Sequence, residues 1–229
     1  MMKKLSPEQK KKRRKRTIIE LSVFAVVLVV AYIYLFMGRK IPDKAPEIEK
    51  GTEGTKELIV YFTRSGVITA EGDVDAVTSA SLTKQDGVTE KAARQLQEIT
   101  GADLYQIRTK RYYKNSFGGT AATAWVEERL KLEPKLLGSP DDISSYDVIY
   151  VGFPVWWFNA PMAIGSFLDE YDLTGKKIVP FCTSQDNGID VCMKYIEKHA
   201  GNGIVLNGYR VNNSSDEDIL RWLENNGLR

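Results

Sequence analysis

The stretch YDVIYVGFPVWWFNAPMAIGSFLDEYDLTGKKIVPFCTS, residues 146–184, carries the clearest structural pattern in this chain. It begins with an apolar, β-branched run at 146–153, continues through an aromatic turn into a helical pattern at 161–171, and ends in a second apolar run at 177–182. Short continuous apolar runs of this kind are typical of parallel strands that are buried on both faces. The stretch therefore predicts a strand–helix–strand unit.

The same alternation continues in both directions from this unit. Ser214 stands at a capping position before the last helical pattern, with Glu217 three residues later, which is a capping-box pattern. Five strands alternating with five helices predict an α/β domain over residues 57–229, whose parallel sheet is covered on both faces. The further strands are predicted at 57–62, 102–107 and 203–211, and the further helices at 89–99, 121–132, 188–199 and 215–225.

Residues 67–87 interrupt the alternation between the first strand and its helix. They are small, polar and aperiodic, whereas a loop from a strand to a helix usually has about 2–6 residues. We therefore expect an insertion at about 67–87.

Three loops of unusual composition follow the first, third and fourth strands. Thr63-Arg64-Ser65-Gly66 is a hydroxyl-rich turn, which suits a phosphate because hydroxyls, backbone N–H groups and a helix dipole all favour an anion. Trp156 and Trp157 are adjacent, so their side chains point to opposite sides and cannot share one core face; at least one is expected to cover a flat ligand. The loop 183–188 is polar. In a doubly wound sheet these loops meet at one edge, where ligands bind.

These segments resemble flavodoxins, in particular a bacterial flavodoxin-like group with two tryptophans after the third strand. The matching pieces are YFTRSG (61–66), VTEKAARQL (88–96), TGADLYQI (100–107), the 146–184 stretch, and the final strand and helix. The resemblance covers about residues 57–229. It implies a flavodoxin-like, doubly wound sheet of five parallel strands in the order 2-1-3-4-5, with FMN as the cofactor.

The resemblance also implies where FMN binds. Flavodoxins hold the FMN phosphate with a Ser/Thr-x-Ser/Thr-Gly-x-Thr loop, whose closing Thr is here Thr89 or, alternatively, Thr69. The 154–160 loop would border the isoalloxazine, with Trp156 or Trp157 stacking on it, and 183–188 would flank it. Neither a catalytic residue nor a metal ligand is expected. The residues expected at FMN are Thr63, Arg64, Ser65, Gly66, Val88, Thr89, Pro154, Val155, Trp156, Trp157, Phe158, Asn159, Ala160, Thr183, Ser184, Gln185, Asp186, Asn187 and Gly188.

Cysteine and histidine are too few for a zinc site made of these two residue types alone. The chain has Cys182, Cys192 and His199, whereas such a structural site needs four ligands. The two cysteines are either a disulfide, if the domain lies in an oxidising compartment, or buried thiols. His199 lies late in a predicted helix and is expected to be a surface or helix-terminal residue.

The N-terminal quarter has a different composition. Residues 1–16 hold nine Lys/Arg and one acid, and residues 18–37 form an apolar run of 20 residues whose only charge is Glu20. A helix of about 20 residues crosses a hydrocarbon core of roughly 30 Å. The run is longer than the apolar part of a signal peptide, and no A-x-A-like site follows it. We expect one transmembrane helix at 18–37, rather than a signal peptide or a buried core helix.

The basic run also indicates the orientation. Lys and Arg next to an apolar span stay on the cytoplasmic side, so residues 1–17 are expected to be a cytoplasmic tail of a cell-membrane protein. Residues 38–56 are rich in Pro, Gly and charge and are expected to be a linker. The domain would then lie outside. Nucleic-acid binding is not favoured, because the rest of the chain has more acidic than basic residues.

Three functions remain open at this point. The preferred one is an electron-transfer flavoprotein, tethered to membrane lipid through residues 18–37, that serves an unidentified redox protein or small electron acceptor. The second is an FMN-dependent reductase that uses NAD(P)H to reduce a quinone, although no GxGxxG follows a strand to bind the nicotinamide. The third is a flavin-free binding module on the same fold.

Overall fold

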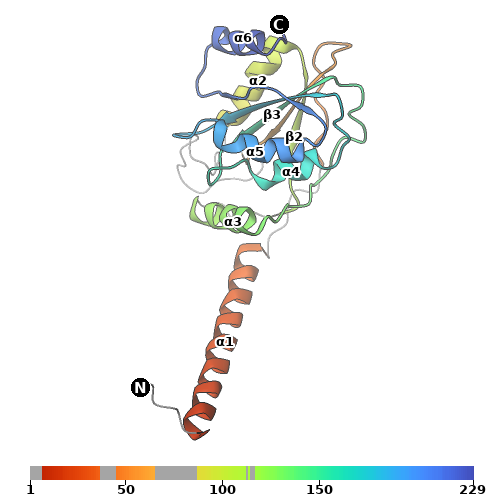
Figure 1. The fold of residues 1–229 in the computed structure, drawn as a ribbon. Helices are drawn as coiled ribbons and strands as arrows, with labels where there is room; N and C mark the ends of the chain where they lie inside the picture. Colours follow the sequence, from red (N-terminus) through yellow and green to blue (C-terminus); the bar gives the residue numbers. More distant parts are fainter. Residues whose placement is uncertain (1–6, 37–44, 65–86, 112, 114–116) are drawn as a thin grey trace. The chain divides into compact units, whose positions relative to one another are not determined.

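The computed structural model describes residues 7–36, 45–64, 87–111, 113 and 117–229. The chain forms two compact units, Met1–Arg39 and Lys40–Arg229, and each is described by itself. The described part of the first unit is a single helix, α1 (Pro7–Phe36), and that of the second contains a parallel sheet with five helices (Figure 1).

Helix α1 carries exposed apolar side chains in its second half. From Ile18 to Val30 its large apolar side chains are 53–62% exposed, and Glu20 among them pairs with Arg16 at 2.9 Å. Within residues 7–36 and the rest of the described chain, no helix is long and apolar enough to cross a membrane. The transmembrane helix expected at 18–37 is therefore not found.

The sheet confirms the predicted strand order. Its strands are all parallel and follow the order β2-β1-β3-β4-β5. All seven residues of β3 are buried, as expected for a central strand covered on both faces. The strands are β1 (Glu57–Phe62), β2 (Asp103–Ile107), β3 (Val148–Pro154), β4 (Lys177–Thr183) and β5 (Ile204–Val205).

The last predicted strand, 203–211, is split in two. A second short strand, β6 (Tyr209–Arg210), pairs with β4 beyond β5. Between them, the N–H of Leu206 donates to the carbonyl of Ile178 at 2.9 Å. In a parallel ladder the carbonyl of Leu206 would accept in turn from residue 180. That residue is Pro180, which has no N–H, so the ladder is interrupted there.

Alternate residues of the strands enter two cores on opposite faces of the sheet. On β1, Leu58, Val60 and Phe62 belong to one core, and Ile59 and Tyr61 belong to the other. Helices α3, α4 and α5 cover the first core, and helices α2 and α6 cover the second (Figure 1). The helices are α2 (Val88–Thr100), α3 (Phe117–Leu130), α4 (Met162–Leu168), α5 (Asp190–His199) and α6 (Asp216–Asn225).

The capping box of α6 lies one residue later than the sequence pattern indicated. Ser215 is the N-cap: its hydroxyl accepts from the N–H of Asp218, and the Asp218 carboxylate accepts from the N–H of Ser215. Ser214 stays outside the helix, where Gln95 donates to its carbonyl at 3.1 Å. Two overlapping Ser-x-x-acid patterns were present, and the packing of α6 against α2 decides between them.

Part of the predicted linker 38–56 belongs to the folded domain. Glu49 and Leu104 exchange both backbone hydrogen bonds at 2.8 Å in antiparallel register, at the outer edge of β2. Lys50 and the N–H of Gly51 each donate to the Asp103 carboxylate at 2.8 Å. These contacts cover an edge strand that would otherwise expose unpaired backbone groups. Residues 38–44 lie outside the described residues.

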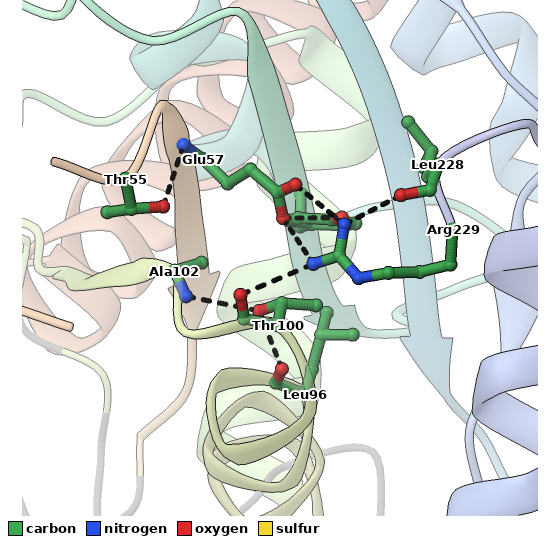
Figure 2. A network of polar contacts seen from close by, with 8 residues as sticks. Thr55, Glu57, Leu96, Thr100, Ala102, Leu228 and Arg229 are labelled. Atoms are coloured by element: carbon green, nitrogen blue, oxygen red, sulfur yellow. Dashed lines mark hydrogen bonds and ion pairs between the residues drawn. The ribbon is translucent and has the colours of Figure 1, made fainter. Parts of the chain in front are cut away.

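The C-terminal residue closes the domain at the amino ends of the strands. Both terminal nitrogens of Arg229 bind Glu57, at 2.8 and 2.9 Å, and one also donates to the carbonyl of Thr100 at 3.3 Å (Figure 2). Tyr150 donates to the same Glu57 carboxylate at 2.9 Å. Charge-assisted contacts of this paired kind are the stronger ones. They hold the first residue of β1 against the end of α2.

Candidate functional site

The turn after β1 and the start of α2 form the first side of the candidate site. Thr63 and Arg64, at the end of β1, are buried. Helix α2 begins at Val88 after the extended Gly87, and no described side chain caps this end. The first N–H groups of a helix have no partner within the helix and carry a partial positive charge, which favours an anion. Ser65, Gly66 and Thr69 lie outside the described residues.

A hydroxyl pair joins this helix end to the end of β4. The Oγ1 atoms of Thr89 and Thr183 lie 2.6 Å apart, and both residues are buried. The carbonyl of Thr183 also accepts from the N–H of Val155, at 3.0 Å, where the loop after β3 begins. The structure thus brings Thr89, Thr183 and the aromatic loop to the carboxyl edge of the sheet, where the sequence predicted them.

The aromatic loop is a tight turn with a strained backbone. Trp156 and Asn159 exchange two backbone hydrogen bonds, at 2.8 and 3.0 Å. Between them, Trp157 and Phe158 have φ values of 49° and 59°. Glycine and asparagine usually fill such positions, and each non-glycine residue there costs on the order of 1–3 kcal/mol. Strain of this kind gathers at binding sites, and here it presents Trp157 and Phe158 46% and 67% exposed.

The two adjacent tryptophans have different environments. Trp156 is 4% exposed and packs edge-on against Phe62 and Tyr113, with ring centres 5.3 and 5.5 Å away. Trp157 is half exposed, and its Nε1 donates to the carbonyl of Ala121 on α3 at 2.8 Å. Trp156 is therefore a core residue. Its Nε1 is buried and has no hydrogen-bond partner among the described residues, which is unusual for a buried indole.

The polar loop 183–188 is held by a residue that the sequence did not indicate. Asn212 accepts from the N–H of Ser184 at 3.1 Å and donates to its carbonyl. The Ser184 hydroxyl accepts in turn from the N–H of Asn187 at 3.0 Å. Gln185 and Asp186 are exposed. Asn212 lies just beyond β6, and the pairing of β6 with β4 is what brings it to this loop.

Arg64 faces α3. Its guanidinium donates to the Thr120 hydroxyl and, at 2.7 Å, to the carbonyl of Tyr113. It also lies 5.3 Å from the centre of the Tyr113 ring, a cation–π distance. Arg64 was expected at FMN, and these contacts give it the additional role of fixing α3 beside the turn after β1.

A buried carboxylate on α3 lies next to the Tyr113 side chain that contacts Arg64. Glu127 on α3 is 1% exposed, accepts from the Tyr113 hydroxyl at 3.0 Å, and pairs with Arg111 at 3.0 Å. Burial raises the pKa of Glu127 to about 7, although Arg111 and the Tyr113 hydroxyl act in the opposite direction. Nothing in the helical pattern 121–132 indicated this residue, because its partners come from the segment after β2.

Both cysteines are free and buried. Burial raises the pKa of Cys182 to about 12 and raises the pKa of Cys192 further. They are thus protonated thiols rather than nucleophiles, and the disulfide alternative is not what this structure contains.

Known proteins resemble this chain over the same domain. A family model described as flavodoxin matches residues 76–226. None of the curated proteins compared with the chain matches it.

Three solved structures can be compared with it. A presumed flavoprotein from Bacteroides eggerthii is 26% identical, with a TM-score of 0.62, and covers 77% of this chain and 100% of its own. One from Bacteroides uniformis is also 26% identical, with a TM-score of 0.60, and the match covers 75% of this chain and 99% of that protein. A flavoprotein in complex with FMN from Lactobacillus acidophilus is 20% identical, with a TM-score of 0.56, and covers 74% and 99%; at that identity it is evidence for the fold alone.

Proposed function

This chain belongs to the flavodoxin family, and from that premise we propose that its folded domain binds FMN and transfers electrons to or from a partner. One observation carries the proposal. The N-terminus of α2, which no described side chain caps, meets a buried hydroxyl pair and a strained aromatic turn at the carboxyl edge of β1, β3 and β4. Ligands of doubly wound sheets bind at that edge. The Lactobacillus acidophilus flavoprotein of the same fold was solved with FMN.

The phosphate would lie at the start of α2. The donors there are the first N–H groups of the helix and the Thr89 hydroxyl, which can donate to the phosphate while it accepts from Thr183. Thr63 remains a predicted ligand. Backbone N–H groups at a helix N-terminus bind an anion by hydrogen bonds and by the helix dipole together. Ser65 and Gly66 remain predicted phosphate ligands by resemblance.

The ring would lie between the 154–160 loop and the 183–188 loop. Trp157 and Phe158 are the exposed aromatic side chains of the first loop, so Trp157 rather than Trp156 is the residue that can stack on a flat heterocycle. The Nε1 of Trp156, in the same loop, is a buried donor that has no partner in the described part of the chain. The loop 183–188 supplies polar contacts from the other side. FMN itself supplies the redox chemistry, and these residues control its exposure.

Two alternatives remain, and a purified sample separates them. A reductase would oxidise NAD(P)H with a quinone as acceptor, whereas an electron carrier would oxidise it slowly or not at all. A flavin-free module would be purified without colour and would not quench its tryptophan fluorescence when titrated with FMN. Stoichiometric FMN binding together with negligible NAD(P)H turnover is the result that the proposal requires.

The location of the domain stays a prediction. The nine basic residues among residues 1–16 and the exposed apolar side chains between Ile18 and Val30 support an association of this segment with membrane lipid. Protease added to intact cells would remove a domain that lies outside and would spare one that lies inside. Extraction of membranes at high pH would show whether the chain is released.

A further inference from the structure

Three ionisable side chains meet at the far end of the domain, away from the candidate flavin site. Glu133 follows α3, Asp169 is the C-cap of α4, and His199 is the last residue of α5. One ligand atom from each lies within 4.8 Å of the other two. All three residues stand at the C-terminal ends of helices, where unpaired carbonyls add partial negative charge. The position therefore favours a cation.

His199 is oriented in a way that leaves one ring nitrogen unused. The residue is at the end of its helix, as predicted, but it is 5% exposed and so does not lie on the surface. Its Nδ1 lies 2.9 and 3.0 Å from the two oxygens of Asp169. Its Nε2 is buried, has no hydrogen-bond partner among the described residues, and lies 3.5 Å from an oxygen of Glu133. That separation is longer than an N–H···O hydrogen bond.

We propose that Nε2 of His199 and a carboxylate oxygen of Glu133 bind a divalent transition-metal ion, for which Zn²⁺ is the type. Zinc takes nitrogen and oxygen ligands at about 2.0–2.2 Å, and two such ligands at a tetrahedral angle lie about 3.4 Å apart. The observed distance of 3.5 Å between His199 Nε2 and Glu133 Oε1 is close to that spacing. A nitrogen ligand distinguishes the site from Mg²⁺ or Ca²⁺ sites, which are built from oxygens.

Asp169 acts on the metal through His199. By accepting from Nδ1–H, it fixes the tautomer that leaves the lone pair on Nε2, as carboxylates behind zinc-bound histidines commonly do. The side chains of Glu133 and Asp169 are 32% and 49% exposed. Glu133 can therefore turn outward to admit the ion, and water can complete the coordination. The ion would connect the segment after α3 to the end of α5, and the site is independent of FMN.

The test uses the full chain, stripped with a chelator and dialysed. Titration calorimetry and thermal unfolding are followed with ZnCl₂ and, separately, with MgCl₂. Zinc should bind with one-to-one stoichiometry and raise the midpoint of unfolding, whereas magnesium should do neither. His199→Gln and Glu133→Gln should each weaken zinc binding at least tenfold, and Asp169→Asn should weaken it by roughly 10–100-fold. Glu197→Gln, an exposed acid on the same helix, should bind like wild type.

Two results would overturn the proposal. One is the absence of zinc binding by wild type; the other is equal binding by wild type, Glu133→Gln and His199→Gln. Either would leave His199 as a packing residue that hydrogen-bonds Asp169 and contacts Glu133 without a metal. Should His199→Gln fail to fold, Glu133→Gln still tests the proposal, because the Glu133 side chain is partly exposed. Cobalt substitution then adds a direct readout, because a nitrogen ligand changes the visible spectrum of bound Co²⁺ and Glu133→Gln should abolish that spectrum.

Discussion

Replacing Thr89 by Val tests whether the start of α2 binds a phosphate. The change keeps the shape of the side chain and removes one hydroxyl, which is buried and 2.6 Å from the Thr183 hydroxyl. Losing that hydrogen bond should lower the free energy of unfolding by about 1–2 kcal/mol. A hydrogen bond from the same hydroxyl to a charged phosphate would contribute about 1.5–3 kcal/mol to FMN binding. The predicted loss of FMN affinity is therefore about 10–150-fold.

The assay compares two ligands and two variants. FMN and riboflavin are titrated against tryptophan fluorescence, since riboflavin has the same ring system and no phosphate. Thr89→Val should weaken FMN binding strongly and change the affinity for riboflavin by less than about threefold. The control is Thr100→Val, at the other end of the same helix, where the hydroxyl donates to the carbonyl of Leu96 at 2.7 Å (Figure 2). That variant should lose comparable stability and bind FMN like wild type.

Two outcomes would refute this reasoning. If Thr89→Val bound FMN like wild type, the phosphate would not lie at this helix end. If FMN and riboflavin lost affinity equally in Thr89→Val, the hydroxyl would act only by holding α2 against β4. In the second case the phosphate would have to be bound by the 63–66 turn without the help of α2.

Three further predictions follow from particular contacts. Trp157→Ala should lower FMN affinity about three- to tenfold by loss of stacking. Trp157→Phe keeps an aromatic ring but loses the hydrogen bond to the Ala121 carbonyl, and its FMN affinity should fall less. Equal FMN affinities for wild type and both variants in fluorescence titrations would exclude Trp157 from the site. The pKa of Glu127 is about 7 in the folded state, whereas an unperturbed glutamate has a pKa of 4.5. The folded state therefore binds the proton more tightly than the unfolded state does. The free energy of unfolding should fall by up to about 3 kcal/mol as the pH rises from 4.5 to 7. Urea unfolding across that pH window should show this component in wild type and not in Glu127→Gln. Deleting Arg229 should lower the free energy of unfolding by about 1–2 kcal/mol, because its paired contact with Glu57 is mostly buried. Lys56→Ala breaks an exposed ion pair with Asp147 and should lower it by less than about 0.5 kcal/mol. Similar unfolding midpoints for the two variants would contradict this.

The sequence was sufficient for the fold and for placing the loops of the candidate site at one edge of the sheet. Both depend on local patterns: continuous apolar runs define strands that are buried on two faces, and their alternation with helices leaves few ways to connect them. The strand order then decides which loops meet, so Thr63, Trp157 and the 183–188 loop could be assigned to one edge. The transmembrane helix was also inferred from composition, and the described residues do not contain one.

Tertiary structure alone decided which partner each polar side chain has. Arg64 binds Thr120 and the carbonyl of Tyr113, and Asn212 holds the 183–188 loop, across separations of 56 and 28 residues in the chain. Sequence periodicity has no information on such pairs, because they depend on where a crossover helix returns the chain. The same holds for Trp156, which only the packing of Phe62 and Tyr113 makes a core residue. It holds also for His199, the last residue of α5, which the convergence of three helix ends buries.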